Sequence, residues 1–283
     1  MNGLIRNVLS IASSTTPAGS ARLTNFNPNA LLFYIDGGAN ALTKAELAKI
    51  NVSVNFKNSK GNGIAVLTNT PLDILADNND YFNGNGLITG DAVCAISLDI
   101  GKYCLRADDE LTFDVAYSSA LTNAAAVIIK AVDSKVMKEK LISYKHIVAS
   151  ASQAYQMADV VSVFAKITSP TDSVYIVTDD FFGSNNISEI AVVAMGAALG
   201  SAEDVDSYGP VWSDDTGYTQ AVTVRAGSFG VSGGERFLVK CWTFDVNRIG
   251  MERAEFNNVQ NLAKAIRDGN PSKFKCLKYF YGK

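Results

Sequence analysis

The feature of this sequence that most constrains its fold is a series of strand-length apolar runs separated by clusters of Gly, Asn and Asp. Several of the runs alternate apolar and polar residues, which is the period of a half-buried strand. In the first half they are ALLFYI (30–35), INVSVNF (50–56), AVCAISLDI (92–100), ELTFDVAY (110–117) and AAAVIIKAV (124–132). The clusters DGGAN (36–40), NSKGNG (58–63) and NGNG (83–86) supply the residues that tight turns need.

A second series of the same kind follows along the chain. Its runs are HIVAS (146–150), DVVSVFAKI (159–167), SVYIVT (173–178), ISEIAVVAM (187–195), QAVTVRA (220–226) and RFLVKCWTF (236–244). The chain has 283 residues, whereas one sandwich domain holds about 100–150. The sequence therefore predicts an all-β protein with two cores.

Self-similarity within the chain supports a duplicated unit. The segment ISLDIGKYCLRADDELTFDVAY (96–117) matches VTVRAGSFGVSGGERFLVKCWT (222–243), with Gly101 over Gly227 and Leu111 over Phe237. A weaker match sets 33–38 and 46–54 over 175–180 and 186–194 in the same order. Both matches predict two related sandwiches, and 96–117 reads as the closing strands of the first.

Helical patterns are confined to three segments. Residues 2–12 space their apolar positions as a short amphipathic segment, which Pro17 and Gly19 then end. PLDILADNN (71–79) predicts a short helix with Pro71 at its first turn. A longer helical pattern begins near Gly250, and a basic, aromatic tail follows it. We therefore expect an N-terminal arm and linker (1–24), a first sandwich (25–135), a second sandwich (136–248) and a C-terminal helix with its tail (249–283).

Composition narrows the functions open to this chain. Hydrophobic residues make up 47% and charged residues 19%, enough apolar material to fill two cores. A net charge of −3 argues against general binding of nucleic-acid backbones. The run MNGLIRNVLSIASS is too short and too interrupted for a membrane span or a signal peptide. The four cysteines form no CxxC pair, so we expect buried, reduced thiols in a protein made in the cytoplasm.

The sequence offers little catalytic chemistry. His146 is the single histidine, so mechanisms that need a histidine base with partners, or several histidine ligands, lack their residues. Acidic pairs such as Asp108–Asp109, Asp179–Asp180 and Asp214–Asp215 lie in turn-rich stretches, where carboxylates are usually solvated. We expect no enzyme and no cofactor, with calcium between subunits left open.

Two stretches carry a resemblance to a known family. NFNPNALLFYIDGGANALTKAELAKINVSVNFK (25–57) and LDIGKYCLRADDELTFDVAY (98–117) resemble the opening and the closing hairpin of the first domain of double jelly-roll major capsid proteins. This lineage of tailless icosahedral viruses includes tectiviruses, corticoviruses and finnlakeviruses, and the resemblance covers roughly residues 25–247. The long C-terminal helix and its tail depart from the pattern.

The resemblance implies a virion protein made in the host cytoplasm, a homotrimer whose six sandwiches form a pseudo-hexagonal tile, often above an internal membrane. Its partners would be further copies, other capsid proteins such as the penton, and membrane lipids. Loops 58–63, 78–90 and 200–219 would face outward or between subunits, and both ends would point inward. Surface-seeking residues at the ends are Leu4, Ile5, Arg6, Val8, Lys273, Lys275, Lys278, Tyr279 and Phe280, and candidate interface aromatics are Tyr208, Trp212 and Tyr218.

Two alternatives remain open at this point. A minor capsid, penton or spike protein can use the same sandwiches, and copy number per particle would separate it from a major capsid protein. A carbohydrate-binding module or glycosidase-like sandwich would instead stack Trp212 and Tyr218 on sugars and bond hydroxyls through Asp214 or Asp215.

Overall fold

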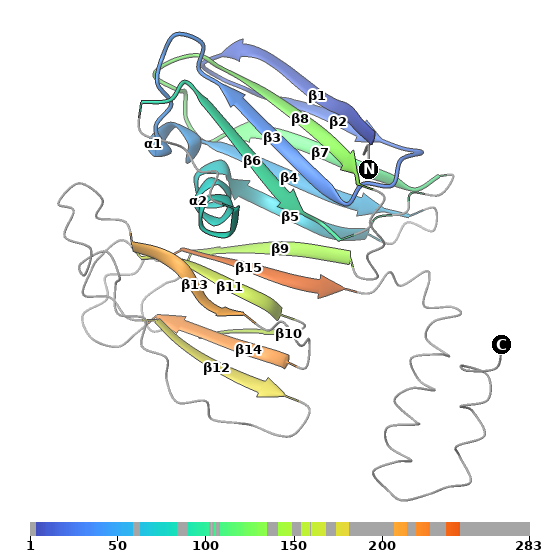
Figure 1. Cartoon of the computed structure of the whole chain (residues 1–283), viewed down its shortest axis with the longest axis vertical. Coiled ribbons are helices and arrows are strands. Elements are labelled where there is room, and N and C mark those ends of the chain that lie inside the picture. The colour runs from blue at the N-terminus through green and yellow to red at the C-terminus, as the bar shows by residue number, and fades with distance from the viewer. Residues whose placement is uncertain are drawn as a thin grey trace, which may run out of the picture. The chain divides into compact units, whose positions relative to one another are not determined.

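The computed structural model divides the chain into two compact units, residues 1–243 and 244–283. It describes residues 4–58, 63–83, 90–101, 103, 105, 108–134, 141–148, 154–158, 160–167, 174–180, 207–213, 219–226 and 236–243. The expected C-terminal helix and tail (249–283) lie outside the described residues. The first unit holds two sandwiches (Figure 1).

The first sandwich consists of eight strands in two antiparallel sheets. The strands are β1 (Leu4–Ser14), β2 (Gly19–Leu23), β3 (Ala30–Asp36), β4 (Ile50–Lys57), β5 (Gly63–Pro71), β6 (Val93–Asp99), β7 (Glu110–Tyr117) and β8 (Ala125–Asp133). One sheet has the order β1-β8-β3-β6 and the other β2-β7-β4-β5. Each sheet thus mixes early and late strands, as two interleaved Greek keys require, and this is the jelly-roll topology.

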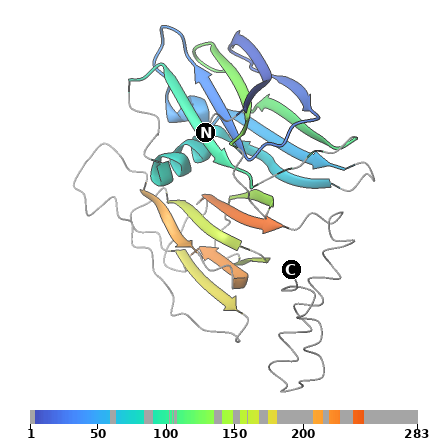
Figure 2. The same ribbon diagram turned by 45° about the vertical axis from the view of Figure 1, so that its right-hand side comes forward.

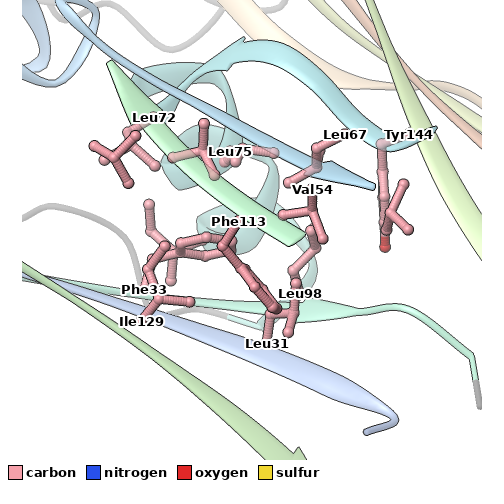
Figure 3. Packing of buried hydrophobic residues seen from close by; sticks show 14 of the residues in the cluster. Leu31, Phe33, Val54, Leu67, Leu72, Leu75, Leu98, Phe113, Ile129 and Tyr144 are labelled. Atoms are coloured by element: carbon pink, nitrogen blue, oxygen red, sulfur yellow. The ribbon is translucent and has the colours of Figure 1, made fainter. Parts of the chain in front are cut away.

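Alternation along these strands produces the core of the first sandwich. In β3, Leu31, Phe33 and Ile35 are fully buried, while the residues between them are half-buried. Figure 3 shows Phe33 and Ile129 from one sheet close to Phe113 from the other. Because successive side chains of a strand point to opposite faces, the predicted period-2 pattern fills the space between the sheets.

Two helices accompany the first sandwich. The short α1 (Lys44–Leu47) begins at Thr43, whose side chain accepts a hydrogen bond from the Glu46 amide at 3.1 Å. The longer α2 (Leu72–Asn83) follows β5 directly. It buries Leu72, Ile74 and Leu75 in the core, together with the polar Asp73 and Asp77. The helix expected at 71–79 is therefore present, although Pro71 ends β5 and lies just outside α2.

The second sandwich repeats the strand order of the first. Its described strands are β9 (Leu141–Val148), β10 (Ala154–Ala158), β11 (Val160–Ile167), β12 (Val174–Asp180), β13 (Ser207–Ser213), β14 (Thr219–Ala226) and β15 (Arg236–Thr243). They pair as β13-β11-β15-β9 and β10-β14-β12. Thus β9, β15, β11 and β13 take the places of β1, β8, β3 and β6. Residues 181–206, which include the run expected at 187–195, lie outside the described residues.

The structure confirms the expected fold class, two tandem jelly rolls. Every predicted run of the first series, and those at 159–167, 173–178, 220–226 and 236–244, coincides with a strand to within a few residues. The run at 146–150 marks only the end of β9.

Three expectations are wrong. Residues 4–14 are not a helical segment but strand β1, which pairs with β8, so they belong to the first sandwich together with β2. The segment 207–213 is strand β13 and not a loop. The stronger internal sequence match is displaced by one strand: 96–117 holds β6 and β7, whereas 222–243 holds β14 and β15, the counterparts of β7 and β8. The weaker match falls partly on 186–194, outside the described residues. Alternating strands and Gly-containing turns recur along the chain, so the pattern does not identify which two strands it marks, and β6 and β7 in fact belong to different sheets.

Candidate functional surfaces

The two sandwiches meet at a joint between β5 and α2 of the first and β9 and β15 of the second (Figures 1 and 2). The amide of Ile142 donates to the carbonyl of Ile100 at 3.0 Å. Next to it, Gly101 forms an isolated antiparallel bridge with Leu141. Backbone pairing therefore continues from the end of β6 into the start of β9.

Two buried tyrosines anchor this joint. The Tyr144 hydroxyl donates to the Asp99 carbonyl at 2.6 Å, and the Tyr103 hydroxyl donates to the Ile142 carbonyl at 3.1 Å. Burial raises the pKa of Tyr144 well above its ordinary value, so its hydroxyl stays a donor. The Tyr103 ring also lies edge-on to Phe56, with 5.4 Å between the ring centroids. Each tyrosine thus fills apolar space and still satisfies its hydroxyl across the joint.

An ion pair spans the same joint beside the tyrosines. The Arg236 guanidinium at the start of β15 donates from Nη2 to Asp73 Oδ1 at 2.8 Å and from Nη1 to Asp73 Oδ2. The Asp73 side chain is 2% exposed and that of Arg236 is 16% exposed. A bidentate pair fixes both groups in one plane, and burial reduces screening by solvent. Sequence reasoning missed this pair, because nothing in either segment indicates that α2 meets β15.

His146 completes this cluster. Its Nε2 accepts a hydrogen bond from Arg236 Nε at 3.2 Å, and the imidazole is half-buried. The pKa of His146 is lowered to about 4, because burial and the positive charge of Arg236 together outweigh the opposing effect of Asp73. The histidine is thus neutral near pH 7.

The predicted N-terminal contact residues lie on β1, at the edge of the first sandwich. Leu4 is 56% exposed and Ile5 is 63% exposed. Arg6 is also exposed and donates from Nη1 to the Thr24 carbonyl at 3.0 Å. Val8 is different, because it is half-buried and packs against the core. The structure therefore leaves Leu4 and Ile5 as the uncovered apolar pair of this group.

The other predicted contact residues are only partly placed. Tyr208 and Trp212 lie on β13, the outer strand of its sheet, opposite Lys166 and Val163 of β11. Tyr218 and the tail residues Lys273, Lys275, Lys278, Tyr279 and Phe280 lie outside the described residues. A role of these residues in subunit or lipid contact stays a prediction.

Several acidic side chains in the described part of the chain bind neighbouring side chains or amides. Glu110 pairs with Arg22 at 3.5 Å, and Asp77 pairs with Lys44 at 3.2 Å. Glu46 accepts from the amide of Thr122 at 3.0 Å and from its hydroxyl at 2.9 Å. Within the described ranges, no three His, Cys, Asp or Glu residues cluster as metal ligands would.

Among the described helices, none has both the length and the apolar character needed to span a bilayer.

Comparison with known proteins finds likenesses among solved structures. No protein-family model and no curated protein matches the chain. The STIV MCP superposes with a TM-score of 0.55 at 7% identity, covering 86% of this chain and 96% of that one. A chain from the atomic structure of Sulfolobus Turreted Icosahedral Virus gives 0.51 at 9% identity, covering 86% and 90%. The major capsid protein of bacteriophage PM2 covers 85% and 97% at 10% identity, with a TM-score of 0.46. The first two likenesses show that the chain has their fold.

Proposed function

We propose that this protein is a structural virion protein, a major capsid protein that tiles an icosahedral shell as a homotrimer. The observation that carries the proposal is the double jelly roll itself, shared with the STIV MCP over most of both chains. A non-enzymatic role accords with this, since the buried polar groups at the joint serve to hold the two sandwiches together.

The way the two sandwiches are joined supports assembly of further copies. The joint is head-to-tail, because β5 of one sandwich meets β9 of the next, and β9 is the counterpart of β1. In a head-to-tail contact each sandwich uses a different surface, so one of the two surfaces stays free at each end of the chain. When these free surfaces bind each other between copies, a closed ring forms if the rotation from one copy to the next adds up to a full turn. Three chains with two sandwiches each would complete a six-sandwich ring.

The uncovered half of this contact is visible on β1. In the second sandwich Leu141 and Tyr144, at the start of β9, are buried. The corresponding start of β1 holds the exposed Leu4 and Ile5, since Leu4 lies opposite Asp133 at the end of β8 as Leu141 lies opposite Thr243 at the end of β15. A long, uncovered edge strand with apolar side chains is a pairing hazard in a monomer. We infer that the second sandwich of a neighbouring copy covers it.

The first test is the solution mass of the purified chain by light scattering, with negative-stain images over a range of concentrations. A trimer of pseudo-hexagonal outline supports the proposal, whereas a persistent monomer contradicts it. Leu4→Lys with Ile5→Lys should reduce self-association at least tenfold and leave thermal stability nearly unchanged. The matched control is Tyr117→Lys, because Tyr117 is 42% exposed but lies on β7. If the β1 variant and the Tyr117 control associate equally well, β1 is not part of the interface between copies.

Lipid contact by the chain ends is part of the same proposal. Under it, the basic, aromatic residues 271–283 bind the internal membrane by charge and apolar insertion. Deleting 271–283 should weaken binding to anionic liposomes, and unchanged binding would assign this segment to subunit packing. The number of copies per purified particle separates a major from a minor capsid role.

A further inference from the structure

The Arg236 guanidinium lies between two acceptors that belong to different sandwiches. Its Nη1 and Nη2 donate to Asp73 on α2 of the first, and its Nε donates to His146 Nε2 on β9 of the second. A guanidinium is always charged and only donates hydrogen bonds. The Nε2 of His146 is therefore the unprotonated nitrogen of a neutral ring.

Protonation of His146 is incompatible with this arrangement. A proton on Nε2 would face the Nε–H of Arg236 across 3.2 Å, so that two donors and two positive charges would meet. Either the ring or the guanidinium must then move. Because the same guanidinium holds Asp73 across the joint, its movement also weakens the contact between the sandwiches.

The other charged groups around His146 offer its proton little compensation. Asp73 is the attractive group, and Arg236 already engages both of its oxygens. The other acidic residues of α2 are Asp77, which pairs with Lys44 of α1, and Asp80, and neither affects the pKa of His146 as Asp73 does. The remaining charges are positive: Lys145 adjoins His146 on β9, and Lys240 of β15 lies 3.7 Å from the carboxylate of Asp99. The sequences of β5 and β13 contain no charged residue, and Lys166 of β11 is the register partner of Arg236.

The titration of the histidine sets the pH window. Burial, reinforced by Arg236, lowers the pKa of His146 to about 4, whereas its ordinary value is 6.5. Between these values the unfolded chain binds the proton and the intact joint does not, so stability falls as the pH drops through this window. Above pH 6.5 the neutral ring keeps its full contribution.

We propose that His146 makes the joint between the two sandwiches acid-responsive. The neutral imidazole accepts a hydrogen bond from Arg236 and helps to hold its guanidinium against Asp73, and the protonated imidazole repels the guanidinium and weakens this contact. Acid would then loosen each subunit at β5 and β9 while the core around Phe33 stays packed. The consequence for a shell rests on the proposed capsid function, but the switch itself is a property of the single chain.

Hydrogen exchange with mass spectrometry tests this directly. Exchange of β5 (63–71) and β9 (141–148) is compared with that of β3 from pH 7 to pH 4, after correction for intrinsic rates. Protection at the joint should fall at least tenfold by about pH 4.5 while β3 stays protected. His146→Gln keeps an acceptor but cannot be protonated, so its loss of protection should move about one pH unit lower. The same midpoint in both proteins would overturn the proposal.

A second measurement needs no variant, because the chain has a single histidine. The NMR titration of the His146 ring should give a midpoint below 5 that coincides with the loss of joint protection. A midpoint near 6.5, or one separated from the exchange transition, would also overturn the proposal. Lys240→Met is the matched control. Lys240 lies on β15 like Arg236, and the change removes its ion pair with Asp99 of β6 but should leave both midpoints unchanged.

Failure of this switch is distinguishable from failure of the capsid proposal. Light scattering at pH 7.5 reports the oligomeric state while His146 is neutral. A monomer at this pH contradicts the proposed trimeric capsid protein, but hydrogen exchange can still test the role of His146 in the single chain. A trimer whose joint shows no acid response supports the proposed capsid function and contradicts the proposed role of His146.

Discussion

Arg236 and Asp73 lie 163 residues apart in the chain, yet they form a bidentate ion pair that joins the second sandwich to the first. The Asp73 carboxylate is almost fully buried, so its charge depends on this partner. The pair occupies the same joint as the Tyr144 hydroxyl bond to Asp99. The two jelly rolls are thereby held in one compact unit, and one cluster of buried apolar residues includes both Phe33 of the first and Phe164 of the second.

Removing one partner of this pair should be more damaging than removing both. Arg236→Met leaves the Asp73 carboxylate buried without its counter-ion, and the free energy of unfolding should fall by about 3 kcal/mol. Arg236→Met combined with Asp73→Leu should recover much of this loss, because no buried charge remains. Urea unfolding at pH 7.5 of the two single variants and the double variant measures the coupling. Additive losses would mean that the pair contributes nothing as a pair.

Glu46 should be a second, pH-dependent contributor, within the first sandwich. Burial raises the pKa of Glu46, but the hydrogen bonds from Lys49 and Thr122 outweigh it and hold the pKa below 4.5. The stability that this carboxylate contributes is therefore present above pH 4.5 and is lost as the pH falls through the lowered value.

Glu46→Gln should lower the free energy of unfolding at pH 7 by about 1–3 kcal/mol. The difference from the unmodified protein should shrink as the pH falls below 4.5. Urea titrations at pH 7 and pH 3.5 check this. Lys49→Met is the control, with a smaller effect expected because the Lys49 side chain is 27% exposed and its ion pair is partly solvated.

Cys94 should be unreactive in the folded protein. It is 1% exposed, and burial, with a contribution from Asp77, raises its pKa to about 11. The thiolate is the reacting species, so an alkylating reagent at pH 8 meets very little of it. Peptide mapping should find Cys94 unmodified in native protein and fully modified in urea. Rapid labelling without denaturant would contradict the burial of this strand.

The sequence predicts the layers of this fold better than their connections. Alternation identifies β3, β6 and β7 because each buries every second residue over most of its length. It fails for β1, whose burial is irregular and whose register with β8 shifts twice, so its apolar positions imitate helical spacing. The internal sequence match is displaced for a similar reason. Alternation and turn residues recur along the chain, so they do not show which strand of one sandwich corresponds to which strand of the other.

The joint was beyond sequence reasoning for a related reason. His146 binds Arg236 of β15, which in turn binds Asp73 of α2, and the three residues are far apart in the chain. Asp73 looks like an ordinary acidic residue in the first turn of a helix. Only the packing of β5 against β9 brings these three groups together. Leu4 and Ile5, in contrast, were singled out for exposed apolar character, and the structure places both on an uncovered edge.

The core of the first sandwich should lose far more from a truncation than its uncovered edge does. Phe33 is fully buried and lies close to Phe113 of the facing sheet (Figure 3). Phe33→Ala should lower the free energy of unfolding by about 3–5 kcal/mol, because it removes apolar contacts and leaves a cavity between the sheets. Ile5→Ala should change it by less than about 0.5 kcal/mol in the monomer, because Ile5 is 63% exposed. Urea unfolding at low protein concentration, where copies are separated, compares the two. Comparable losses would mean that β1 is already covered within a single chain, and the free edge would then have no neighbour to bind.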